Sequence, residues 1–178
     1  MTFNDCTAEC GSYFALTHCV NGWQEEVADI TVTGGDIHTK KECVLVKSHN
    51  MMLDLCDVNI SSDKGILVHT IVNDDPCATK VTKDVFGVNV VMTDMDVKGD
   101  LLHEDTTREM WVMLNSTQLT GAIQHANVAF DKGSKWVATA DSDVVFVTDV
   151  EPAQIDAPTG VTITAKGAQA GEFALAGG

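Results

Sequence analysis

Residues 88–125 contain nearly the same unit twice, and this repeat constrains the fold more than any other feature of the chain. Four positions recur 22 residues later: Val90, Met92, Met95 and Val97 are matched by Val112, Leu114, Thr117 and Leu119. The steps between them are two, three and two residues. A straight strand alternates faces every two residues, so the step of three predicts a corner after which the chain points inward again. A unit that bends at fixed offsets is typical of a parallel β-helix.

The same pattern is found three more times toward the N-terminus. The matching sets are Leu53, Leu55, Val58 and Ile60; Ile30, Val32, Gly35 and Ile37; and Met1, Phe3, Cys6 and Ala8. The sequence therefore predicts five stacked coils that share one set of inward columns. Short polar side chains at the corners, such as Asp94 and Ser116, are able to bond locally to the backbone.

Two regions depart from the regular spacing. The interval between Leu53 and Val90 is 37 residues, which predicts a loop inserted at about 73–87. After His125 the pattern loosens, and we expect Trp136, Val145 and Val147 to face inward, with a last strand at Val161–Ala165. The glycine- and alanine-rich residues 166–178 are expected to be loosely ordered. We predict a single domain over residues 1–178.

Charge and composition exclude several classes of function. The 178-residue chain has 11 Lys and Arg residues against 26 Asp and Glu residues, a formal net charge of −15. This charge opposes binding to nucleic acid and to anionic membrane surfaces. No run approaches the roughly 18–20 apolar residues needed to span a bilayer, so membrane insertion is not expected. The N-terminus lacks the basic and apolar segments of a secretion signal, and we expect a fragment of a longer exported chain.

The six cysteines all lie within the first 77 residues, at Cys6, Cys10, Cys19, Cys43, Cys56 and Cys77. None forms a C-x2-C pair, which disfavours a zinc site. An even number permits disulfides in an oxidising compartment, and small buried thiols in stacked coils are the alternative. We predict no particular bridge.

Three histidines each follow a glycine by four residues: His69, His103 and His125. If coils stack about 4.8 Å apart, the three imidazoles would form a row able to hold a transition metal. A repeated residue also forms such a row simply because the unit repeats. We therefore treat these histidines as candidate ligands only, and predict neither a metal nor a cofactor.

The acidic corners are a second candidate site. Asp94 and Asp96, with Asp57 and Asn59 one coil earlier, offer oxygen ligands for calcium. A calcium-dependent lyase also needs a base, and Arg108 and Lys98 are the nearby cations. Solvated acidic corners explain these residues better, so no catalytic residue is predicted.

Three segments carry a resemblance to a known family: DVKGDLLHED, LNSTQLTGAI and SKWVATADSDVVFVTD. They resemble the right-handed parallel β-helix repeats of bacterial cell-surface proteins, whose superfold is shared with pectate lyases and polygalacturonases. The resemblance covers about residues 28–165. It implies an all-β, single-stranded right-handed parallel β-helix, a solenoid of about seven coils with one inserted loop.

The same resemblance implies a function. We expect a non-catalytic extracellular or cell-surface segment, adhesin-like, that serves as a stalk or as a binding face for carbohydrate or a host surface protein. The alternative is a polysaccharide-active enzyme of this fold, a uronate lyase or glycoside hydrolase. The open strand edges at the ends of a solenoid also lead us to expect end-to-end homo-oligomers.

Overall fold

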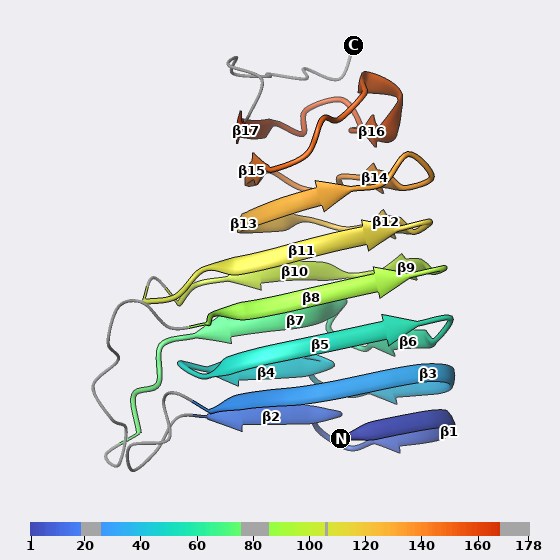
Figure 1. Cartoon of the computed structure of the whole chain (residues 1–178), viewed down its shortest axis with the longest axis vertical. Helices are drawn as coiled ribbons and strands as arrows, with labels where there is room; N and C mark the ends of the chain where they lie inside the picture. Colours follow the sequence, from blue (N-terminus) through green and yellow to red (C-terminus); the bar gives the residue numbers. More distant parts are fainter. Residues whose placement is uncertain (19–25, 76–85, 106, 168–178) are drawn as a thin grey trace.

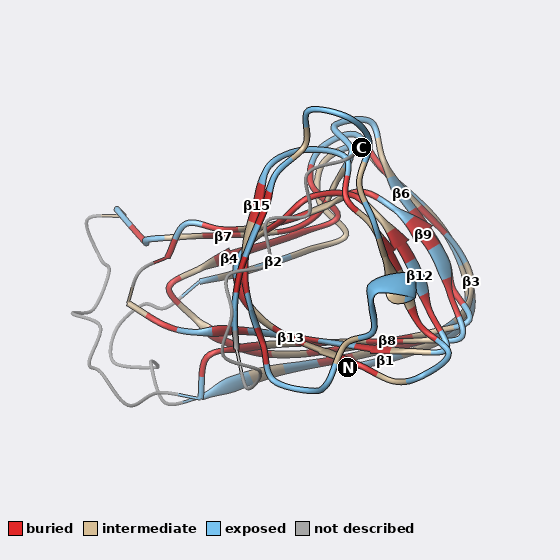
Figure 2. Cartoon of the chain, turned by 90° about the horizontal axis from the view of Figure 1, so that it is seen from above, coloured by how far each residue is buried: buried red, intermediate tan, exposed pale blue. Residues whose placement is uncertain are grey.

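The protein is an all-β structure built from a curled parallel sheet, with strands stacked along its long axis (Figure 1). The computed structural model describes residues 1–18, 26–75, 86–105 and 107–167. Seen from above, the stacked strands surround one interior on three sides (Figure 2). In the described ranges the single helical element is a short 3-10 turn, η2 (Pro152–Gln154).

The strands of the first side form the longest ladder. They are β1 (Thr2–Cys10), β3 (Val27–Thr39), β5 (Asn50–Cys56), β8 (Val88–Thr93), β11 (Met110–Asn115), β13 (Ile123–Phe130), β15 (Ser142–Phe146) and β17 (Ile163–Gly167). The second side continues from the first half of β13 through β10 (Asp100–His103), β7 (Ile66–Ile71), β4 (Val44–Lys47) and β2 (Ala15–His18). The third side consists of β6 (Asn59–Ser62), which pairs with the end of β3, and of β9 (Asp96–Lys98), β12 (Gln118–Thr120), β14 (Lys135–Val137) and β16 (Ile155–Asp156).

The predicted stacking of the repeat is confirmed residue by residue. Val112 lies opposite Val90, and Leu114 lies opposite Met92. The same column continues to Leu55, which pairs with Met92. These side chains are almost fully buried and belong to one continuous hydrophobic core. Each strand therefore buries its apolar face against the strands above and below it and against the facing sides.

The predicted corner is also confirmed, and its backbone explains the choice of residues. Five stacked corner positions adopt a left-handed conformation with φ between 48° and 67°: Asp5, Gly34, Asp57, Asp94 and Ser116. Short polar residues and glycine tolerate this conformation far better than β-branched residues. The recurrence of Asp, Gly and Ser at this offset thus follows from the turn that the chain makes there.

Near the C-terminus the structure corrects part of the prediction. Trp136 is fully buried as expected, and its indole N–H donates to the carbonyl of Gly121 at 2.8 Å. Val145 and Val147, expected to face inward, are exposed. Val144 and Phe146 face the core instead. Phe146 of β15 pairs with the buried Val128 of β13, and this register determines which alternate residues of β15 point inward.

Parts of two other predictions lie outside the described residues. The inserted loop expected at 73–87 includes residues 76–85, and the chain end expected to be loosely ordered includes 168–178. Four of the six cysteines are described, Cys6, Cys10, Cys43 and Cys56, and each is a free thiol. Burial raises the pKa of Cys43 to about 11, so this thiol is unreactive at neutral pH.

Candidate functional site

The most distinctive surface of the protein is the outward side of the first ladder, centred on Trp111 in β11. The pairing of the strands places Asn89 and Asn127 on either side of Trp111, and Val91 and Ala129 on either side of Met113. Val145 continues the Trp111 column beyond Asn127. We call the surface formed by these residues the Trp111 face: Asn89, Val91, Trp111, Met113, Asn127, Ala129 and Val145.

The Trp111 face is unusually apolar for an exposed surface. The exposed fractions of Trp111 and Met113 are 40% and 46%. Phe86, just before β8, is 50% exposed, and its carbonyl accepts a hydrogen bond from the side chain of Asn89 at 3.4 Å. Contiguous exposed apolar surface on a protein of this size generally marks a binding site. An exposed tryptophan beside a flexible methionine is typical of such sites.

Charge distinguishes the Trp111 face as well. The chain has a net charge of −15, yet none of the residues that form the face has an ionisable side chain. The outward residues that follow in β8 and β11, Thr93 and Asn115, are also neutral, and the amide of Asn115 donates to the hydroxyl of Thr93 at 3.5 Å. The face is thus a neutral strip, bordered by Asp54 opposite Val91, on a strongly acidic molecule, and it is suited to an uncharged ligand.

Trp111 and the two amides provide complementary groups for such a ligand. The indole offers a flat apolar surface, and each asparagine side chain offers both a donor and an acceptor. The side chain of Asn127 makes no hydrogen bond within the described part of the chain, so its amide is available. Rigid strands hold the three side chains in neighbouring positions, which lowers the entropic cost of binding.

The predicted row of three histidines does not form. The pairing of β10 with β7 shifts by one residue between Asp100 and Leu101, so His69 lies opposite Leu102, and His103 lies opposite Thr70. A shift of one residue moves a side chain to the other face of the strand. His69 therefore lies on the outside, with its ring nitrogens 3.7 Å from Glu42 and 3.4 Å from Glu104. His125 is exposed at an irregular position with φ of 56°.

His103 is instead part of a buried polar cluster. Its Nε2 donates to the carbonyl of Arg108 at 3.0 Å, so its Nδ1 accepts from the hydroxyl of Thr70 at 2.5 Å. The Arg108 guanidinium lies 3.7 Å from the carboxylate of Asp105, and both side chains are almost completely buried. Arg108 therefore stabilises the turn between β10 and β11, and is not placed to act as the base of a lyase.

The burial of His103 predicts a loss of stability on acidification. Burial lowers the pKa of His103 below its ordinary value of 6.5, so below that pH the unfolded chain takes up the proton first. The contribution of neutral His103 is complete above about pH 6.5 and is lost as the pH falls toward the folded-state value. We expect urea unfolding midpoints to decrease between pH 7.5 and 5.5. His103→Gln should flatten this decrease.

The same experiment separates His103 from the perturbed carboxyl groups. A hydrogen bond from Ser134 lowers the pKa of Asp131 below 3.8. Burial tends to raise the pKa of Glu42, but hydrogen bonds and nearby positive charge, with Lys64 contributing both, outweigh it and leave the pKa below 4.5. Because the pKa of each carboxyl group lies below its ordinary value, both groups lose their stabilising contribution below the pH range of 7.5 to 5.5. An unchanged midpoint between pH 7.5 and 5.5 would contradict the buried, neutral assignment of His103.

Two of the acidic candidate residues lie at the exposed corner, and the other two candidates, Asn59 and Asp96, begin the strands β6 and β9 that follow it. Asp57 and Asp94 occupy stacked corner positions, and Asp96 lies opposite Gln118. The amide of Asn59 donates to Asp36 at 2.9 Å. Lys98 is exposed on β9. Within the described ranges, no group of three or more His, Cys, Asp or Glu residues is arranged to hold a metal ion.

A cavity of about 310 Å³ opens at the N-terminal end of the stack. Phe3 and Phe14 meet there edge to face, with their ring centroids 5.2 Å apart. The lining residues are Met1, Phe3, Phe14, Ala15, Leu16, Thr17, Ala28, Asp29 and Ile30. End-to-end association, expected from the sequence, would cover this cavity and stays a prediction.

Comparison with known proteins assigns no family. No protein-family model, no curated protein and no solved structure matches this chain. In the part of the chain that the structure describes, no helix has the length and apolar character to cross a bilayer.

Proposed function

We propose that the curled sheet is a right-handed parallel β-helix that serves as a non-catalytic binding segment of an extracellular or cell-surface protein. The in-register parallel pairs over successive repeats support the β-helix, since neighbouring strands in the sequence fall on different sides of one interior. The Trp111 face supports the binding role. Stacked strands of this kind present a rigid surface of fixed geometry without requiring a lid or cofactor.

The favoured ligand is a neutral carbohydrate. A pyranose ring has an apolar C–H face that packs on an indole, and peripheral hydroxyls that bond to amides such as those of Asn89 and Asn127. The single observation that carries this proposal is the exposed Trp111 between two asparagines on an uncharged strip. The absence of titratable groups in the face favours binding over acid–base chemistry, which needs a group to take up or release a proton.

Substitution of Trp111 tests the proposal. We expect Trp111→Ala to weaken binding to neutral polysaccharides, such as glucans, mannans or chitin, by about 2 kcal/mol, or roughly thirtyfold. The free energy of unfolding should fall by about 1 kcal/mol, the order of a cross-strand contact, so the variant stays folded. Binding is measured by affinity electrophoresis and isothermal titration calorimetry. Leu16→Ala on the opposite side, 46% exposed in the wild type, is the matched control and should bind normally.

Other outcomes would identify other functions. Stronger binding to pectins and uronate polymers than to neutral glycans would contradict the charge argument. Release of unsaturated products from those polymers, with calcium present, would favour the alternative of a polysaccharide-active enzyme. If the protein binds none of the glycans but binds a cell-surface protein in a Trp111-dependent way, the face is assigned to a host-protein partner.

A further inference from the structure

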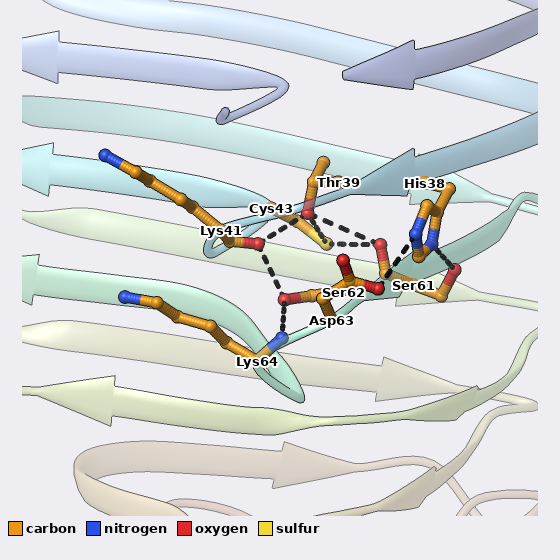
Figure 3. A network of polar contacts seen from close by, with 8 residues as sticks. All are labelled: His38, Thr39, Lys41, Cys43, Ser61, Ser62, Asp63 and Lys64. Carbon is orange, nitrogen blue, oxygen red and sulfur yellow. Dashed lines mark hydrogen bonds and ion pairs between the residues drawn. The ribbon is translucent and has the colours of Figure 1, made fainter. Parts of the chain in front are cut away.

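Three side chains far from the Trp111 face form a continuous hydrogen-bonded chain: Ser61, His38 and Asp63 (Figure 3). Ser61 in β6 lies directly opposite His38 in β3. The Ser61 hydroxyl is 3.0 Å from Nδ1 of His38, and Oδ1 of Asp63 is 3.1 Å from Nε2. A hydroxyl, an imidazole and a carboxylate in this order are the components of an activated serine.

The positions of the protons follow from the partners. The Asp63 carboxylate only accepts hydrogen bonds, so it favours the tautomer of His38 in which Nε2 carries the hydrogen. Nδ1 then presents its lone pair to Ser61 and accepts the hydroxyl hydrogen. The imidazole is thereby oriented as a base toward Ser61, with the two ring nitrogens exchanged relative to the familiar serine-protease arrangement.

The turn after β6 holds Asp63 in place. Its backbone N–H donates to the carbonyl of Thr39 at 2.9 Å. The hydroxyls of Thr39 and Ser62 both donate to the carbonyl of Lys41 at 2.6 Å, and Thr39 is completely buried (Figure 3). The backbone that carries Asp63 is therefore held by hydrogen bonds to neighbouring strands and loops, as preorganisation requires.

The nearby ammonium groups are engaged elsewhere. Lys64 Nζ lies 3.2 Å from the carboxylate of Glu42, and Lys41 Nζ lies 5.0 Å from the ring centroid of Tyr13. The carboxylate of Asp63 therefore interacts with the imidazole of His38 and not with either ammonium group. The side chains of His38 and Asp63 are 38% and 58% exposed, so a reagent in solution reaches the group without any opening of the fold.

Ser61 of β6 is the nucleophile, but the backbone of the turn after β6 does not supply donors that stabilise an oxyanion. The backbone N–H groups of Asp63, Lys64 and Gly65 already donate to Thr39 or Ser62. Without oxyanion donors a serine reacts but turns over poorly. We propose that Ser61 is an activated serine and a site of covalent modification, which accepts an acyl group from an activated ester and releases it slowly.

Acylation of Ser61 displaces the leaving group of the ester. Oγ of Ser61 attacks the ester carbonyl, forming a new C–O bond, while the bond to the phenol or thiol leaving group breaks. The serine proton passes to Nδ1 of His38 and then to the leaving group. With a fluorophosphonate the O–P bond forms, the P–F bond breaks, and fluoride leaves with the proton. The acyl group is released by hydrolysis: water attacks the acyl carbonyl, the C–O bond to Oγ breaks, and one proton of the water returns to Ser61. None of these steps requires an oxidant or a metal.

The test is labelling of the folded chain with a fluorophosphonate and, separately, with p-nitrophenyl acetate, followed by peptide mapping. We expect one major adduct, at Ser61, that forms without multiple turnovers. Ser61→Ala should abolish it, and His38→Gln should slow it about a hundredfold. Asp63→Asn should also slow the formation of the adduct. His18→Gln is the matched control, since His18 is another exposed histidine beside a carboxylate, 3.7 Å from Asp75, and should leave the rate unchanged.

Two results would overturn this inference. One is equal labelling of Ser61 and other exposed serines. The other is a Ser61 rate that is unaffected by both His38→Gln and Asp63→Asn in variants whose circular dichroism matches the wild type. Fast, repeated turnover of p-nitrophenyl acetate at Ser61 would retain the activated serine but contradict its slow release. None of these outcomes depends on the Trp111 face.

Discussion

Gly121→Ala is expected to lower the free energy of unfolding by about 3 kcal/mol or more, one of the largest effects of any single substitution in this protein. A Cβ at position 121 would lie 2.0 Å from the carbonyl oxygen of Gly99 and 2.6 Å from its carbonyl carbon. Both atoms are backbone and are unable to rotate away. The two layers would have to separate, which would weaken the bonds that Gly121 makes with Val137 and Trp136.

Two other glycines provide matched controls. A Cβ at Gly11 would meet nothing within 4 Å, and one at Gly133 would meet its nearest atom at 3.5 Å, an ordinary contact. Neither glycine has a left-handed φ. Alanine at these positions should change the free energy of unfolding by less than about 0.5 kcal/mol. Urea denaturation followed by circular dichroism measures all three variants, and equal effects at positions 121 and 133 would contradict the close stacking.

The sequence predicts the stacking well because stacking itself generates the repeat. Inward residues such as Met92 and Leu114 occupy one environment in successive layers, so the same kind of side chain is selected at a constant interval. The recurring glycines have the same origin. Gly99 and Gly121 meet backbone to backbone, which explains their place in both copies of the repeat.

The histidine row was wrong because periodicity does not reveal a β-bulge. Gly65, Gly99 and Gly121 share one motif, but the extra residue between Ile66 and Val68 moves His69 to the outside. A bulge depends on hydrogen bonds between layers, which a single sequence does not display. The same limitation explains Val145. Residues 144–147 are all apolar, so the sequence does not show which alternate side chains point inward until the pairing of β15 is known.

The Trp111 face was missed although the sequence contains a signal for it. In the segment Met110–Leu114 every residue is apolar, whereas the two-residue alternation of a half-exposed strand requires every second residue to be polar. Once Val112 and Leu114 are assigned to the core, Trp111 and Met113 must face outward. The neutrality of the face could not be foreseen, because it depends on which residues of β8 and β13 lie beside β11.

Asp105→Ala is expected to destabilise the protein by about 3–5 kcal/mol, because it leaves the buried guanidinium of Arg108 without this carboxylate. The Asp105 side chain also accepts hydrogen bonds from the backbone N–H of Thr107, at 3.0 Å, and from its hydroxyl. These contacts fix the turn that leads into β11. Urea unfolding at neutral pH measures the effect.

The double variant Asp105→Ala/Arg108→Met distinguishes a buried ion pair from simple loss of packing. Removing both charges leaves no buried cation that has lost the carboxylate of Asp105, so the double variant should recover most of the lost stability. If it is instead less stable than Asp105→Ala alone, the guanidinium stabilises the turn through its other contacts. Asp105 is not part of the Trp111 face, so Asp105→Ala should weaken ligand binding only to the extent that it unfolds the chain. Trp111→Ala, by contrast, should weaken binding in a protein that remains folded.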